Sequence, residues 1–140
     1  MSRPQHTRNI LLFTYEGGMM LDVVGPADVF GAACQIVTAQ TGATVPPYKL
    51  SVISGKAGSV SMSNGLQLVA AHAYADVKGP IDTLLICGGS ETGMRAVEQD
   101  AKFSSWLKRK SEKVDRLGSV CSGAFFLARA GLLDGHRATT

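Results

Sequence analysis

The apolar positions along the chain form two different patterns, unbroken runs and a three-to-four spacing. Residues 9–15 and 83–87 are nearly unbroken apolar runs, the pattern of strands buried on both faces of a parallel sheet. Residues 20–39 carry apolar side chains at three-to-four spacing, which predicts a helix. The expected strands are 9–15, 48–54, 60–62, 66–69, 83–87, 116–120 and one beginning at 137, and the expected helices are 20–39, 91–99, 100–113 and 122–130. Strands that alternate with helices predict an α/β fold with a largely parallel sheet.

The segment 119–124 combines the end of a strand, a sharp turn and the start of a helix around Cys121. A short apolar run precedes it, and a run rich in helix-forming residues follows. The exposed N–H groups and the dipole of a helix N-terminus favour thiolate over thiol at such a position. This is the arrangement of a nucleophile elbow with cysteine in place of serine. The pattern predicts a cysteine enzyme or a domain derived from one.

Two further features fall at the same edge of the predicted sheet, where sites gather in α/β folds. Gly88 and Gly89 follow the strand 83–87 directly, and Asp22 lies where the first helix starts. The N–H groups of Gly89 and Ser122 would together form an oxyanion hole. Each feature also has a structural interpretation: a tight turn for the glycines, a helix cap for Asp22 and a packed thiol for Cys121. Their coincidence at one edge favours a functional site.

A cysteine nucleophile usually needs a base, and the chain holds three histidines. His6 falls in the expected N-terminal tail, His72 follows the predicted hairpin at the surface, and His136 lies in a turn. None of them is a convincing partner for Cys121.

Composition narrows the function classes further. The chain has 140 residues, 45% of them hydrophobic, which fits one globular domain, and its net charge of +3 is too small to indicate nucleic-acid binding. Its three cysteines lack metal-ligand spacing, so we expect no disulfide and no metal, with Cys34 and Cys87 buried as small apolar side chains. The glycine-rich residues 88–93 lack the Lys-Ser/Thr of a P-loop, and we expect no cofactor. Without an apolar stretch near ~20 residues or a signal peptide, we expect a cytoplasmic protein with no membrane contact.

Several motifs together resemble the ThiJ/PfpI family, within the class I glutamine amidotransferase-like superfamily. Residues 119–125 and 130–140 carry its elbow and the segment after it, residues 21–30 fit Leu-Asp-x-x-Gly-Pro-x-x-Val-Phe, and residues 80–89 fit as well. The resemblance implies a flavodoxin-like three-layer α/β/α sandwich over residues 9–140, preceded by a flexible tail at 1–8.

Within that family the chain is similar to the amidase-like N-terminal domain of AraC-type transcriptional regulators, which precedes two helix-turn-helix motifs. Isonitrile hydratases share the same motifs and are the nearest enzymes. The resemblance implies that Cys121 takes the nucleophile position and Asp22 that of its acidic partner. The implied ligand-binding residues are Gly88, Gly89, Ser122 and Gly123.

The family pattern continues Ala-Thr-Thr-His-Trp, whereas this chain ends at Thr140, where the family histidine would be next. We therefore expect a domain that is incomplete at its C-terminus, truncated before its last strand and helix, whether as a fragment or as a truncated product. A sheet without its last strand would expose an edge and invite association.

Three hypotheses follow for the function. The first is a ligand-sensing domain of an AraC-type regulator that is not itself an enzyme. It would bind a small metabolite such as an amide, amine or amino-acid derivative, form a homodimer, and reach DNA only through a helix-turn-helix module absent from this chain. The alternative is a cysteine-dependent hydratase or hydrolase resembling isonitrile hydratase. A weaker third hypothesis is redox sensing through oxidation of Cys121.

Overall fold

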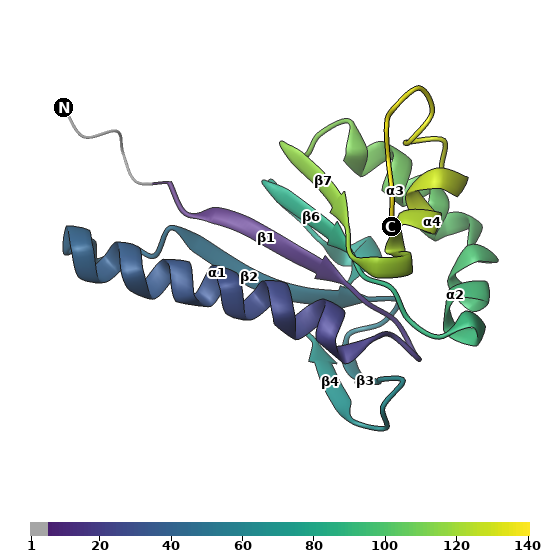
Figure 1. The fold of residues 1–140 in the computed structure, drawn as a ribbon, viewed down its shortest axis with the longest axis horizontal. Helices are drawn as coiled ribbons and strands as arrows, with labels where there is room; N and C mark the ends of the chain where they lie inside the picture. The colour runs from purple at the N-terminus through teal and green to yellow at the C-terminus, as the bar shows by residue number, and fades with distance from the viewer. Residues whose placement is uncertain (1–5) are drawn as a thin grey trace.

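The computed structural model describes residues 6–140, so most of the expected tail at 1–8 lies outside the described residues. Five parallel strands form one sheet in the order β5-β2-β1-β6-β7, and β3 and β4 form an antiparallel pair (Figure 1). The strands are β1 (Arg8–Phe13), β2 (Tyr48–Ser54), β3 (Gly58–Ser61), β4 (Gln67–Ala70), β5 (His72–Ala73), β6 (Thr83–Ile86) and β7 (Arg116–Ser119). The α-helices are α1 (Met20–Thr41), α2 (Glu91–Glu98), α3 (Ala101–Ser111) and α4 (Ala124–Arg129).

The central strand β1 sends alternate side chains into two separate hydrophobic clusters. Leu11 and Phe13 join the cluster that α3 and α4 cover, whereas Leu12 joins the cluster beside α1 and the β3–β4 pair. Successive residues of a strand point to opposite faces, so a strand that is apolar throughout needs cover on both. The predicted three-layer α/β/α arrangement, with a largely parallel sheet, is therefore confirmed.

The helix α3 shows how local sequence sets an element and its packing. Asp100 caps it by accepting hydrogen bonds from the backbone N–H groups of Lys102 (3.0 Å) and Phe103 (3.2 Å). Phe103, Trp106 and Leu107 lie on one side of the helix and are buried. The same pattern in the sequence predicted this helix.

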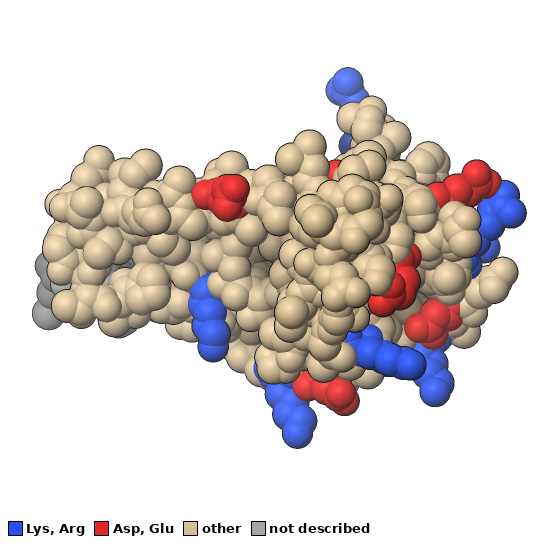
Figure 2. Space-filling model, turned by 90° about the horizontal axis from the view of Figure 1, so that it is seen from below, with Lys and Arg blue, Asp and Glu red and all other residues tan. Residues whose placement is uncertain are grey.

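The helix α1 behaves differently, because only Asp22 and Val23 among its 22 residues are buried. Leu21, Val29 and Ile36 are among its large apolar side chains and are exposed. Figure 2 shows the resulting surface: charged side chains gather at one end of the molecule, and the elongated end that contains α1 is mostly uncharged.

By length and composition alone, α1 is long and apolar enough to cross a membrane. The expectation that no stretch approaches that length was therefore wrong, because the polar residues of α1 are few and widely spaced. Core helices and N-terminal signal sequences meet the same criterion. The first turn of α1 is packed into the domain, where Val23 is 1% exposed.

Two expectations at element ends need correction. The strand expected from residue 137 does not form within the described chain, and the segment instead returns to the elbow, where the Thr140 hydroxyl donates to the Cys121 carbonyl (2.6 Å). The helix expected at 122–130 begins with a 3-10 turn at Cys121–Gly123 and continues as α4. The two-residue strand β5, which pairs with the end of β2, was not predicted because it is too short to show a pattern.

Candidate functional site

Cys121 adopts a backbone conformation that side chains normally avoid. Its φ of 53° is positive, and it is the one non-glycine residue with positive φ in the described part of the chain. The strand β7 ends two residues earlier, and the Val120 N–H donates to the Ile86 carbonyl (2.9 Å), which fixes the approach to the turn. Strain of this kind persists where surrounding structure imposes it, and it is typical of a nucleophile elbow. The predicted elbow is present, and Cys121 is exposed there.

The elbow is packed against the end of β6 with no room for a side chain. A Cβ at Gly123 would overlap the carbonyl oxygen of Ile86, and one at Gly88 would lie 2.8 Å from the Ser122 nitrogen and 2.9 Å from an Asp22 carboxylate oxygen. Glycine is therefore required at both positions by close approach of backbone to backbone. The sequence motifs at 88–89 and 121–124 are two halves of one contact.

Asp22 joins the start of α1 to this contact. Its side chain is 7% exposed, and its Oδ2 accepts a hydrogen bond from the Gly88 N–H (2.9 Å). The Cys87 thiol donates to the Asp22 backbone carbonyl at 3.3 Å. The carboxylate thus lies at the predicted sheet edge, directly at the contact between Gly88 and the elbow, and it holds the loop after β6 in place.

Of the two N–H groups expected to form an oxyanion hole, that of Gly89 has a partner within the chain, and so does the N–H of the neighbouring Gly88. The Gly88 N–H is bonded to Asp22, and the Gly89 N–H donates to the Ser122 Oγ at 3.3 Å. Gly89 also pairs with Gly18 in an isolated bridge from the loop after β1. The donor role assigned to Gly89 and Ser122, and the ligand-binding role of Gly88 and Gly123, remain predictions.

Tyr15 belongs to this site, although sequence reasoning did not single it out. It is 4% exposed, and its buried hydroxyl has no hydrogen-bond partner in the described chain. A Cβ at Gly89 would lie 3.0 Å from that hydroxyl. Burial raises the pKa of Tyr15 far above its usual value, and the acidic groups of Cys87 and Asp22 act in the same direction. The sequence did hold a signal for Tyr15, because this tyrosine is the last residue of the first apolar run, residues 9–15.

The other two cysteines differ from Cys121. Cys87 is fully buried, and burial, followed by the nearby Asp22, raises the pKa of its thiol to about 12. Its expected role as a small buried side chain is confirmed. Cys34 is half-buried, so the same expectation holds for it only in part, and its thiol donates to the Tyr48 carbonyl at 3.4 Å.

Within residues 6–140, no hydrogen bond or ion pair joins a histidine side chain to Cys121. His6 lies 3.8 Å from Asp82, which precedes β6 and so falls at the opposite end of the sheet, and His72 lies in β5. His136 lies in a turn, where its N–H donates to the Leu133 carbonyl (3.0 Å). The same residues hold no group of three or more His, Cys, Asp or Glu side chains placed to share a metal ion.

Comparison with known proteins places this geometry in a family, since residues 8–140 match the DJ-1/PfpI family. The chain belongs to the DJ-1/PfpI family. It is 36% identical over 131 residues to a protein of Streptomyces lividans described as uncharacterized, from the cpoL 5' region, covering 94% of this chain and 85% of that one. The ThiJ/PfpI resemblance drawn from the motifs is thereby confirmed.

Other relatives of this DJ-1/PfpI domain are longer proteins. The HTH-type transcriptional regulator GbdR of Pseudomonas aeruginosa is 34% identical over 89 residues, which are 64% of this chain and 23% of the regulator. The isonitrile hydratase of Pseudomonas putida is 28% identical over 120 residues, 86% of this chain and 46% of the enzyme. The chain thus spans less than half of either protein.

Solved structures carry the same fold. A THiJ/PfpI family protein from Pseudomonas syringae superposes with a TM-score of 0.77 at 25% identity, over 93% of this chain and 48% of that one. An AraC family transcriptional regulator from Pseudomonas putida superposes with a TM-score of 0.67 at 25% identity, over 92% of this chain and 64% of that one. The relatives of the domain therefore include transcriptional regulators and an enzyme.

Proposed function

We propose that this DJ-1/PfpI domain is the ligand-sensing part of an AraC-type transcriptional regulator. The observation that carries the proposal is the similarity to regulators both in sequence and in a solved structure. The elbow is compatible with a binding role, because Cys121 is exposed there.

The proposed sensor works in the cytoplasm as a homodimer and recognises a small amide, amine or amino-acid derivative at the elbow. The exposed apolar side chains of α1, among them Val29 and Ile36, supply a surface that association would cover. A ligand bound beside Gly88 would disturb the hydrogen bond between the Gly88 N–H and the Asp22 carboxylate. Because Asp22 lies in the first turn of α1, the effect of binding would be transmitted to that helix. DNA would be contacted only by a helix-turn-helix module outside these residues.

The test uses the protein together with whatever sequence follows Thr140 in its gene. We expect a helix-turn-helix module there, and binding to its own promoter region that changes when a metabolite extract is added. Asp22→Ala should abolish the change while leaving basal DNA binding intact, and Asp28→Ala, on the exposed part of α1, should leave both intact. A gene product with no DNA-binding module would refute the proposal.

A cysteine-dependent hydratase is the second candidate, favoured by the strained, exposed Cys121 and by the isonitrile hydratase relative. The thiolate would add to the isonitrile carbon, which takes up a proton. Water would then add to the same carbon, and release of the thiolate would leave an N-substituted formamide. Asp22 would orient the water or supply the proton.

Formation of the formamide from an alkyl isonitrile, followed by gas chromatography, decides between the two candidates. The enzyme hypothesis expects turnover that Cys121→Ala removes and Cys34→Ala preserves. An absence of turnover in the protein with its natural continuation, or activity that survives Cys121→Ala, refutes it.

A further inference from the structure

The exposed side of α1 carries a stripe in which large and small side chains alternate. Leu21 is 70% exposed, Val29 69% and Ile36 56%. Val23 and Phe30 lie on the opposite side, where Val23 joins a core cluster and Phe30 packs on a ring of β2 with centroids 5.0 Å apart. We call the stripe the α1 seam, and its residues are Leu21, Gly25, Val29, Ala32, Ile36 and Ala39. Their spacing of four and three residues is that of the contact line between two packed helices.

Gly25 lies inside α1, at a position where the described chain gives no reason for a glycine. A Cβ there would meet only the side chain of Leu21 in the preceding turn, at an ordinary 3.9 Å. Glycine inside a helix is less favourable than alanine, and its usual reason is a close approach by another segment. No described segment makes that approach, so the space beside Gly25 is open to a molecule outside this chain.

A second copy of α1, running antiparallel to the first, fits the α1 seam layer by layer. Val29 then lies opposite the partner's Ala32. One layer further, Ile36 lies opposite the partner's Gly25. Large side chains that enter the spaces beside small ones give the interlocking contact of paired helices. A parallel pair would instead place Val29 on its own copy and Gly25 on its own copy, which crowds one layer and leaves the next one empty.

The polar residues beside the α1 seam favour the same direction. The helix contains two acidic residues and no basic one, and Asp22 is buried against the Gly88 N–H, so Asp28 is its one exposed charge. In the antiparallel pair Asp28 lies beside the partner's Gln35, whose amide group donates hydrogen bonds to a carboxylate. In a parallel pair it would lie beside the partner's Ala33, which offers no donor in its side chain. A lipid surface would fit the apolar side chains but requires no alternation of large and small ones.

We propose that two copies of this chain associate through the α1 seam, with the helices antiparallel and Val29 opposite the partner's Ala32. This dimer is the homodimer of the proposed function, and the proposal rests on that part of it alone. Leu21 is covered by the second half of the partner's α1. Its neighbour Asp22, which accepts the Gly88 N–H (2.9 Å), lies directly below that contact. Each copy therefore helps to fix the elbow contact of the other.

Disulfide cross-linking tests the direction and the register, in protein whose exposed Cys121 is replaced by serine. Ile36→Cys mixed with Gly25→Cys should give a cross-linked dimer in non-reducing electrophoresis, because the two introduced thiols share one layer. Ile36→Cys alone should give none, since its two copies lie roughly 16 Å apart along the helix axis. Thr38→Cys is the matched control, exposed on the same helix but off the seam, and it should not cross-link to Gly25→Cys.

A steric variant tests the close approach at Gly25. Gly25→Leu fills the space that the partner's Ile36 needs but meets only its own helix within one chain. Light scattering should show dimerisation weakened at least tenfold, while circular dichroism shows the helix content retained. Gly31→Leu is the control, because it also enters open space but on another side of α1, and it should leave the dimer intact.

The outcomes separate this proposal from the broader one. A wild-type protein that is monomeric at high concentration overturns both the homodimer and the α1 seam. A dimer that cross-links through Ile36→Cys alone, fails to cross-link Ile36→Cys to Gly25→Cys, or tolerates Gly25→Leu overturns the α1 seam and leaves the homodimer standing. The DNA-binding test of the proposed function is unaffected by any of these results.

Discussion

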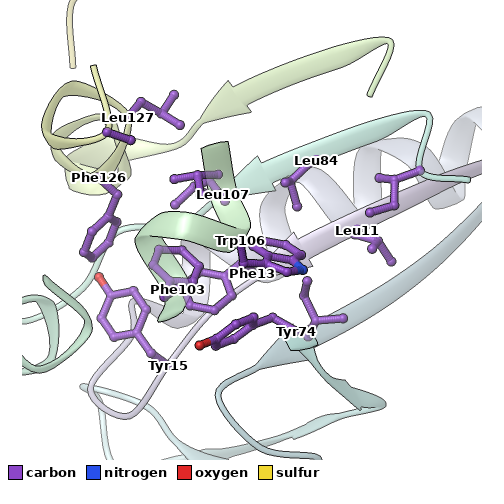
Figure 3. Packing of buried hydrophobic residues seen from close by; sticks show 14 residues of the cluster. Leu11, Phe13, Tyr15, Tyr74, Leu84, Phe103, Trp106, Leu107, Phe126 and Leu127 are labelled. Carbon is purple, nitrogen blue, oxygen red and sulfur yellow. The ribbon is translucent and has the colours of Figure 1, made fainter. Parts of the chain in front are cut away.

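The two faces of the sheet are covered in opposite ways. On one face, α3 buries Phe103, Trp106 and Leu107, and aromatic rings from four elements interlock (Figure 3). On the other face, α1 buries two of its 22 residues and leaves Val29 and Ile36 exposed. The first face is a packed core, whereas the second is covered by a helix most of whose residues are not buried.

This difference explains how the candidate site is held. The elbow is followed by α4, whose Phe126 and Leu127 are buried in the packed face, so its position follows from dense side-chain contacts. Asp22 comes from the loosely covered face and reaches the site through its hydrogen bond to the Gly88 N–H (2.9 Å). A change at the start of α1 would thus be felt at the site through this carboxylate and through the hydrogen bonds beside it, from the Met19 N–H to the Gly88 carbonyl (2.9 Å) and from the Cys87 thiol to the Asp22 carbonyl (3.3 Å).

The largest expected effect is loss of a ring from the packed face. Phe103→Ala should lower the free energy of unfolding by about 3–5 kcal/mol, because it removes a stacked ring and leaves a cavity. Val29→Ala, on the exposed side of α1, should change it by less than about 0.5 kcal/mol. Urea unfolding followed by circular dichroism measures both, and equal losses would mean that the two faces do not differ.

Matched glycine substitutions give the next largest contrast. Gly123→Ala should destabilise by about 1–3 kcal/mol or more, since the new methyl group overlaps the Ile86 carbonyl. Gly31→Ala meets open space in the middle of α1 and should stabilise by about 0.5–1 kcal/mol. Thermal unfolding of both variants checks this, and a neutral Gly123→Ala would contradict the tight elbow contact.

Substitutions at Asp22 test the side-chain link between the start of α1 and the loop after β6. Asp22→Ala should cost about 1–3 kcal/mol of unfolding free energy, because the buried Gly88 N–H loses its acceptor. Asp22→Asn keeps an acceptor oxygen and should cost less. Asp28→Ala is the control on the exposed part of the same helix, and an equal loss there would assign the effect to α1 in general.

Alkaline pH should weaken the fold, with contributions from both faces. Burial raises the pKa of the Tyr15 hydroxyl, and raises those of Tyr74 and Cys87 to about 12, so each group ionises more readily in the unfolded chain. Their stabilisation is complete below pH 9, the ordinary cysteine value, and is lost as pH rises through the folded-state values. Urea midpoints between pH 8 and 11 measure the decline. In Cys87→Ala the urea midpoint should fall less steeply with pH. An unchanged slope would show that the Cys87 thiol does not contribute to the loss of stability.

The smallest effect on stability is expected on the exposed side of α1. The double substitution Val29→Glu and Ile36→Lys should leave the unfolding free energy within about 0.5 kcal/mol. If the proposed homodimer uses this surface, the same change should convert a dimer to a monomer in light scattering. A wild-type protein that is already monomeric at high concentration would remove this part of the proposal.

Much of the architecture was predictable because it depends on local patterns. Unbroken apolar runs gave β1 and β6, and the Asn64-Gly65 turn gave the β3–β4 pair, where Gly65 has a φ of 85°. The elbow at Cys121 was visible as a strand, turn and helix in sequence. The exposure of α1 was not visible, because its apolar pattern alone does not say how many neighbours cover it.

The candidate site, like the fold, was partly predictable from the sequence and partly decided by the tertiary structure. The sequence by itself singled out the candidate residues, since Cys121, Asp22 and the glycine pair each end or begin a recognisable element. Only the tertiary structure decided their relations: that the Gly88 N–H is held by Asp22, that Gly123 packs against the Ile86 carbonyl, and that the buried Tyr15 hydroxyl lies beside Gly89. These facts depend on contacts between segments far apart in the chain, and local periodicity holds no information about such contacts.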